Sequence, residues 1–337
     1  MAIGSGLGSQ FMFKNESAYG TRVVPDHTIK TTAQLVDPNK VRAQSTGLQS
    51  GAIGPLGDHY VDTNEDGNST FEFECESKGI GLLLQALMGT TVTPALLTGS
   101  AYSQTHTFAD PVGKSLTLQQ GVPIRAGGTG KCEELNGARC TSMEFTIGAG
   151  GFLHASSVWD GHQYDETQTL ATPSYSLSRP FTFRDGTLKT GVFNSEVALT
   201  GSVRSMSVKI ERLLDTADFT LGSQFKQEPV LNGLGMITGT ITSDFTAASK
   251  AAIQDLSLSN TPTSLVYDFV GAAATGWSVI SGTTYPEFKI VVPSAYFDAS
   301  TANPNGPAEI TASYNWTWRY DGTNMPFIYV VSSDATL

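Results

Sequence analysis

Two segments of the 337-residue chain alternate apolar and polar side chains with a period of two. In the first segment, Phe71, Phe73 and Cys75 alternate with Glu72, Glu74 and Glu76. In the second, Ala312, Tyr314, Trp316, Trp318 and Tyr320 alternate with Ser313, Asn315, Thr317 and Arg319. Such alternation places one set of side chains on each face of a β-strand. The chain must therefore contain strands with one buried and one solvated face.

The composition narrows the class of protein further. The formal net charge is −11, yet only 15% of residues are charged, against about 25% in a typical domain. Proteins that coat nucleic acid are basic, because phosphate neutralisation supplies most of their affinity. Helical bundles are richer in Glu and Lys, and disordered chains hold fewer apolar residues than the 39% found here. A β-rich globular protein with many turns remains.

The length predicts two domains of about 150 residues each. Cys75, Cys132 and Cys140 are an odd number of cysteines, which is typical of a reducing compartment. A disulfide between Cys132 and Cys140 across a hairpin stays open as the alternative. The N-terminus lacks a signal-peptide pattern, and the apolar run at 80–88 is too short to cross a bilayer. We expect a protein that is soluble and intracellular when made.

The chain divides by composition into four parts. Residues 1–25 begin with small, flexible residues and predict an N-terminal arm. The polar stretch at 28–67 predicts a long loop or a pair of extended segments. The predicted division is an arm at 1–25, a first β domain at 26–165, a linker at 166–180 and a second β domain at 181–337.

Each half is predicted to contain one short helix among its strands. The first helix spans about 78–88 and is closed by Gly89, and the second spans 246–256 with Thr246 as its N-cap. The glycines at 148–151 predict a hairpin turn. The remaining strands are predicted at 103–108, 115–121, 137–147, 152–159, 192–199, 203–213, 236–245, 264–270, 287–292 and 310–320.

The order of elements repeats between the halves. FEFECESKGIGLLLQALMG lines up with TITSDFTAASKAAIQDLSL, and RCTSMEFTIGAGGFLHASSVWDG lines up with residues 295–322, with WDG against YDG. We interpret this as tandem duplication of one β domain. Two unrelated β domains are the alternative.

The most suggestive ligand motif is the run from Asp62 to Gly67. Asp62, Asn64 and Asp66 occupy positions one, three and five of a calcium-binding loop. Position twelve, which should be a bidentate Glu, is Phe73, and a strand follows instead of a helix. We interpret the run as a solvated acidic turn, with a calcium site as the alternative.

Motifs for catalysis are missing from the sequence. His154, Asp160, His162 and Asp165 match no common metal-ligand spacing. The chain contains no nucleophile-elbow G-x-S-x-G, no P-loop and no G-x-G-x-x-G after a strand. Trp316 and Trp318 are expected in a core. The sequence predicts neither an enzyme nor a cofactor.

Several segments carry a family resemblance. They are AIGSGLGSQFMFKNESAYGT, SKGIGLLLQALMG, SQTHTF, GKSLTLQQGVP, CTSMEF and EPVLNGLGMITGTITSDF. They resemble the major tail tube proteins of long-tailed, siphovirus-type bacteriophages, especially those of actinobacterial phages. The resemblance covers most of the chain and is weaker in the second half.

The resemblance implies a structural virion protein of all-β sandwich or barrel tube domains, each with one short helix. Such subunits form rings of six tube domains, and two domains per chain would make a ring of three chains. Strands of neighbouring subunits join into a barrel around a lumen, and the rings stack into a tail that conducts double-stranded DNA. The implied partners are copies of the same chain, a tape measure protein, and tail terminator and distal tail proteins, with no membrane. The implied location is the virion tail, after assembly in the bacterial host cytoplasm.

The resemblance also suggests roles for particular residues. The N-terminal arm of such proteins reaches the next ring, which makes Ile3, Leu7, Phe11 and Phe13 inter-ring candidates. An acidic lumen would repel phosphate, which makes Glu72, Glu74 and Glu76 candidates for the lumen wall. The alternative function is a calcium-dependent β-sandwich binding or adhesion module, based on the Asp62–Gly67 run and the aromatic strands.

Overall fold

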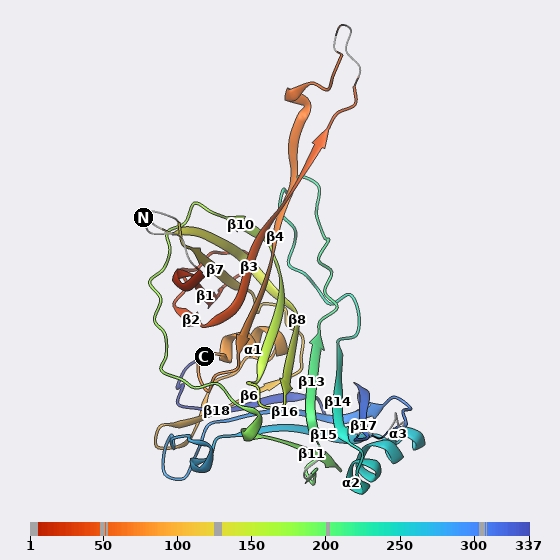
Figure 1. The fold of residues 1–337 in the computed structure, drawn as a ribbon. Helices are drawn as coiled ribbons and strands as arrows, with labels where there is room; N and C mark the ends of the chain where they lie inside the picture. Colours follow the sequence, from red (N-terminus) through yellow and green to blue (C-terminus); the bar gives the residue numbers. More distant parts are fainter. Residues whose placement is uncertain are drawn as a thin grey trace.

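A computed structural model describes residues 6–47, 51, 53–124, 130–199, 203–302, 307 and 309–337. Strands dominate it, and a long two-stranded ribbon stands away from the rest of the molecule (Figure 1). The all-β class with short helices is confirmed.

The first half contains ten strands and one α-helix among its described residues. The strands are β1 (Gln10–Asn15), β2 (His27–Ile29), β3 (Thr31–Gln44), β4 (Tyr60–Glu74), β5 (Ala95–Thr98), β6 (Ala101–Thr107), β7 (Leu116–Val122), β8 (Lys131–Gly148), β9 (His154–Gly161) and β10 (Gln163–Asp165). The helices are α1 (Gly81–Met88) and the short 3-10 turns η1 (Gly6–Gly8) and η2 (Gly57–His59). Gly89 closes α1 in the left-handed conformation, as predicted.

The second half follows with eight strands in its described residues. They are β11 (Gly186–Gly191), β12 (Val197–Ala198), β13 (Val203–Glu211), β14 (Met236–Asp244), β15 (Thr263–Val270), β16 (Glu287–Phe297), β17 (Thr311–Trp318) and β18 (Phe327–Ser332). The helical turns are η3 (Phe183–Asp185), α2 (Ala247–Ser249), η4 (Lys250–Gln254), α3 (Asp255–Ser259) and η5 (Ala273–Thr275). Thr246 caps α2 as predicted, with its Oγ1 accepting from the amide of Ser249 at 3.1 Å.

The strand pairings of the first half recur in the second. The first half pairs β2-β1-β7-β8 and β3-β4-β9-β8, and the second pairs β12-β11-β15-β16 and β13-β14-β17-β16. A last short strand then returns to the long central strand, β10 to β8 and β18 to β16. The predicted repeat of element order is therefore confirmed at the level of topology.

The repeat extends to single residues. The β3–β4 register shifts between Thr31 and Ala33, and the β13–β14 register shifts between Val203 and Ser205. Aligning the two halves at these shifts makes Ser69 of β4 equivalent to Gly239 of β14. Ser69 pairs with Trp159 in β9 and Gly239 pairs with Trp316 in β17, so the two tryptophans are equivalent. Both are at most 1% exposed. The predicted match of WDG with YDG is wrong, because it would place Trp159 on the exposed Tyr320. Equivalent tryptophans at equivalent sites support duplication of one domain.

Two seams join the halves. In one, β13 pairs with the last seven residues of β8, and in the other, β18 pairs with β6. Arg212, at the end of β13, donates to the carbonyls of Leu87, Met88 and Ala109 and so caps helix α1 of the first half. The two halves therefore share continuous sheets.

The N-terminal segment differs from the prediction. Residues 10–15 form β1, which pairs with β2 and β7, and Phe11 and Phe13 are fully buried. The prediction of an arm through residue 25 is wrong for this stretch. Three apolar residues in a row supply enough buried area to hold a short strand in the core once β7 provides its hydrogen-bonding partner.

Three other predictions change. The stretch at 28–67 takes the extended form, because β3 and β4 pair from Thr31–Phe73 to Gln44–Tyr60. The strand predicted at 192–199 is shorter, because a turn from Val192 to Ser195 separates β11 from β12. Cys132 and Cys140 are free and lie in the same strand, so a disulfide between them across a hairpin is wrong.

Candidate functional site

One face of a seven-stranded sheet is polar across both halves. Its strands are β3-β4-β9-β8-β13-β14-β17, with the β8–β13 seam at its centre. In Figure 1 these strands run roughly along the direction of the ribbon, and β15, β16, β18 and β6 cross them. In β13, Met206, Val208 and Ile210 are buried and the alternate residues are partly exposed. The same alternation in the neighbouring strands produces one wide polar surface.

The polar face is rich in hydroxyl groups. Thr240 donates to the Asn315 amide oxygen at 2.8 Å, and the hydroxyls of Thr242 and Ser313 lie 2.9 Å apart. These side chains bond to each other across β14 and β17. Leu35, Val158 and Met236 are exposed apolar residues on the same face. Its described polar residues on β4, β9, β8, β13, β14 and β17 are Asn68, Thr70, Glu72, Glu74, His154, Ser156, Ser142, Glu144, Thr146, Ser205, Ser207, Lys209, Glu211, Thr238, Thr240, Thr242, Asp244, Thr311, Ser313, Asn315 and Thr317.

The structure places two of the three predicted glutamates on this face. Glu72 and Glu74 lie on β4 opposite Ser156 and His154, and the Glu72 side chain is 46% exposed. Glu76 lies beyond the end of β4, is only 16% exposed, and pairs with the Lys30 ammonium at 2.7 Å. Its charge is therefore compensated locally.

Further charges on the face were missed from the sequence. Glu144 and Glu211 add negative charge on β8 and β13, and Lys209 pairs with Glu211 at 2.5 Å. Asp244 on β14 pairs with Arg204. The alternating pattern of residues 203–211 and 236–244 predicts that these charged residues share one face of their strands. The sequence does not show which face of the whole sheet that is, because this depends on the pairing of β8 with β13.

The predicted arm residues are dispersed in the structure. Leu7 lies in η1 and is 98% exposed. Phe11 and Phe13 are core residues of β1, so in this conformation they cannot contact another ring. Ile3 lies outside the described residues.

The calcium candidates lie in a strand, with a register shift at Thr63 between Asp62 and Asn64. Asp62, Asn64 and Asp66 fall in β4, where alternate residues are about 7 Å apart along the chain and do not converge on one cation. Asp62 pairs with Arg42 at 2.7 Å, and Asp66 pairs with Lys226 at 3.1 Å. Among the described residues no group of three His, Cys, Asp or Glu side chains is arranged to hold a metal ion. The interpretation as an acidic turn is therefore also wrong.

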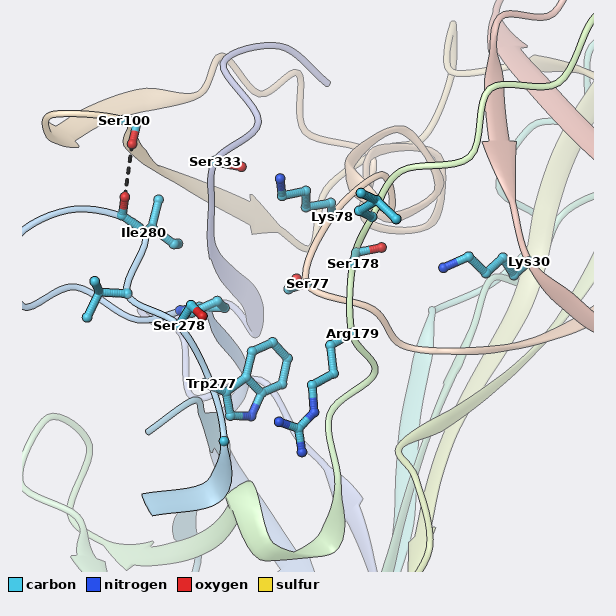
Figure 2. Close-up of a pocket in the computed structure, with 14 residues that line it drawn as sticks. Lys30, Ser77, Lys78, Ser100, Ser178, Arg179, Trp277, Ser278, Ile280 and Ser333 are labelled. Atoms are coloured by element: carbon cyan, nitrogen blue, oxygen red, sulfur yellow. Dashed lines mark hydrogen bonds between the residues drawn. The ribbon is translucent and has the colours of Figure 1, made fainter. Parts of the chain in front are cut away.

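A pocket between the halves is lined by cationic side chains (Figure 2). It has a volume of about 550 Å³ and is lined by Lys30, Lys78 and Arg179 and by several serines. The Arg179 guanidinium lies 5.1 Å from the Trp277 ring centre, a cation–π distance. Its described lining residues include no His, Cys, Asp or Glu, but the hydroxyl of the lining Ser178 donates to the Glu76 carboxylate, which also pairs with Lys30.

Two strand edges lack the partner that their counterparts have. Within the described residues β3 pairs only with β4, whereas its equivalent β13 pairs with both β14 and β8. Residues 298–302 follow directly after β16. The Asp298 amide bonds to the Asn315 carbonyl, at the position where Ser142 pairs with Val158 in the first half. Residues 298–302 are therefore equivalent to the β8 residues that pair with β13. No described strand pairs with residues 298–302 on that side. The two edges are therefore complementary.

A comparison with models of protein families identifies the family of the chain. A family model described as phage tail tube protein matches residues 6–317, which is nearly the whole chain. No curated protein matches the chain. Among the described residues, no helix combines the length and apolar character needed to span a membrane.

Proposed function

Because the chain belongs to the phage tail tube protein family, we propose that it assembles into rings of three chains that stack into a hollow tube for double-stranded DNA. The family makes it a structural protein of the virion tail. The ring, the lumen and the partners named below are parts of our proposal.

The β8–β13 seam is the observation that carries the proposal. It joins two equivalent domains edge to edge within one chain. The same junction between chains would pair β3 of one chain with residues 298–302 of the next. Three chains would then place six tube domains in one closed ring with no strand edge left open, as a heterologous interface that closes requires.

The internal seam predicts the register between chains. In the register of the seam, Lys209 of β13 lies directly opposite Glu144 of β8. By the equivalence of the halves, Lys209 corresponds to Asp37 and Glu144 corresponds to Ser300. The proposed interface therefore pairs Asp37 of one chain with Ser300 of its neighbour.

The polar face is proposed to line the lumen. Its opposite face carries the buried residues of both halves, so the polar side is the one available to a channel. It carries four glutamates and one aspartate against Lys209 and Arg204, and hydroxyls that are bonded to each other. A wall of this kind offers DNA no net gain from counterion release and so would let it slide. Glu72 and Glu74 are part of this proposed wall, and Glu76 is not.

The ribbon, defined as residues 41–44 of β3 and 60–64 of β4, is proposed to contact another copy of the chain, in the next ring. It is exposed on both faces over most of its length. The remaining proposed partners are a tape measure protein and the tail terminator and distal tail proteins, with assembly in the host cytoplasm.

A cysteine pair tests the ring directly. We expect Asp37→Cys with Ser300→Cys to form disulfides between chains in assembled material, because residues paired across strands lie within disulfide range. The largest covalent species on a non-reducing denaturing gel should be a trimer. The control is Asp37→Cys with Thr220→Cys, which should remain monomeric. Absence of cross-linking in well-formed tubes would reject the proposed interface.

Charge reversal tests the lumen. Glu72→Lys with Glu74→Lys should leave tubes intact in electron micrographs and reduce DNA ejection, because the wall would then attract phosphate. The matched control is Asp255→Lys, at an exposed position of α3 that belongs to neither the polar face nor the ribbon. Equal ejection by both variants would place the polar face elsewhere.

A further inference from the structure

A lysine is buried between two aspartates where the halves meet. Lys226 belongs to the loop of residues 212–235 that connects β13 with β14, and it is 1% exposed. Its ammonium contacts the carboxylate of Asp160, at the end of β9, and lies 3.1 Å from that of Asp66 in β4. A residue of the second half is therefore held between two strands of the first.

An ion pair alone does not satisfy this cluster. Two aspartates and one lysine leave one negative charge uncompensated in a buried place. Asp66 Oδ1 and Asp160 Oδ2 are also buried without a hydrogen-bond partner. Both conditions are costly unless one carboxyl is neutral.

The surroundings fix the reacting groups. The Lys226 carbonyl accepts a hydrogen bond from His162 Nδ1 at 2.8 Å, and the Gln224 carbonyl accepts one from the backbone amide of Glu65 at 2.9 Å. Burial raises the pKa of Asp160 to about 6, against the opposing pull of Lys226. The loop backbone is thus clamped on both sides of Lys226, and the Asp160 carboxyl takes up a proton more readily than usual.

We propose that Lys226 and Asp160 join in an isopeptide bond, formed by the protein itself, that ties the second half to the first. An amine held in contact with a protonated carboxyl and screened from water meets the requirements for amide formation. The bond would close a loop of the 66 residues that separate the two positions.

The step balances without any co-reactant. It starts from protonated Asp160, ionised Asp66 and the Lys226 ammonium. Asp66 takes one proton from the ammonium, and the freed Nζ lone pair attacks Cγ of Asp160 to form the C–N bond. Asp66 gives its proton to the Asp160 hydroxyl, the C–O bond breaks and water leaves. Asp66 then takes the second proton from Nζ, which leaves a neutral amide beside a neutral carboxyl.

Intact mass under denaturing conditions tests the proposal. Purified wild-type protein should be lighter than its sequence by one water molecule, and digestion should yield a branched peptide joining Lys226 to Asp160. Asp66→Asn keeps both reacting groups but removes the proton carrier, so it should show the full mass. Lys226→Arg should also show the full mass, with folding checked by circular dichroism.

The matched control is Lys189→Arg. Lys189 also contacts a buried aspartate, Asp268 at 2.6 Å, but the lysine is 35% exposed. This variant should still lack one water molecule. A full-mass wild-type protein, or a branched peptide at Asp66, would overturn the proposal.

Discussion

The two halves treat the connection between equivalent strands in opposite ways. Between β3 and β4 the chain forms the ribbon, in which Val41, Tyr60 and Val61 are about half exposed. Between β13 and β14 it forms the loop of residues 212–235, which lies along β4 and buries Lys226. Figure 1 shows the ribbon standing clear of the molecule. The loop packs against the first half, whereas the ribbon is exposed over most of its described residues.

The comparison shows what the ribbon needs. An isolated two-stranded hairpin is marginally stable in water, because neither face is covered. The loop gains its order from the first half through Lys226 and through Arg139, which is 1% exposed and pairs with Glu228 at 2.8 Å. By equivalence, the ribbon should gain its order from another chain.

Shortening the ribbon should produce the largest effect. Replacing residues 41–63 by a two-residue turn should abolish tubes in electron micrographs and leave the monomer folded, because most of these residues are exposed. Thermal unfolding of the monomer should shift little. Tubes of normal length from this variant would show that the ribbon contacts no other copy.

Breaking a charge pair should affect the two connections unequally. Lys226→Met should destabilise the monomer by about 3–5 kcal/mol, because Asp66 and Asp160 stay buried and lose the lysine that contacts them both, together with any covalent bond to it. Arg42→Met breaks the exposed pair with Asp62 on the ribbon and should leave monomer stability unchanged. Denaturant unfolding measures both variants. Equal losses would contradict the distinction between a docked loop and a free ribbon.

Acid should weaken the seam between β6 and β18. Burial lowers the pKa of His106 in β6 to about 4. The unfolded chain then binds the extra proton, so stability falls as the pH drops from 6.5 towards 4, by about 2 kcal/mol at pH 5. The measurement is the difference between wild type and His106→Gln, because the contributions of the other titrating groups cancel in that difference. A difference that does not vary with pH would mean that His106 is solvated.

The sequence predicted elements whose pattern is local. Alternation placed the end of β4 and all of β17, and a capping threonine and a closing glycine placed the helices. It could not place β1, because FMF is too short to show a period and depends on β7. It could not place the docked loop either, since Lys226 is a single lysine whose partners lie 66 and 160 positions away. The polar face was predictable in part. Its residues alternate with apolar ones in the sequence, but only the β8–β13 seam shows that the two halves form one continuous face.

A density map of the assembled tube at side-chain resolution tests the central claim most directly. The account predicts three chains in each ring, with β3 paired to residues 298–302 of the neighbouring chain and Glu72 and Glu74 facing the lumen. Six chains in each ring, or a lumen lined by other strands, would contradict it.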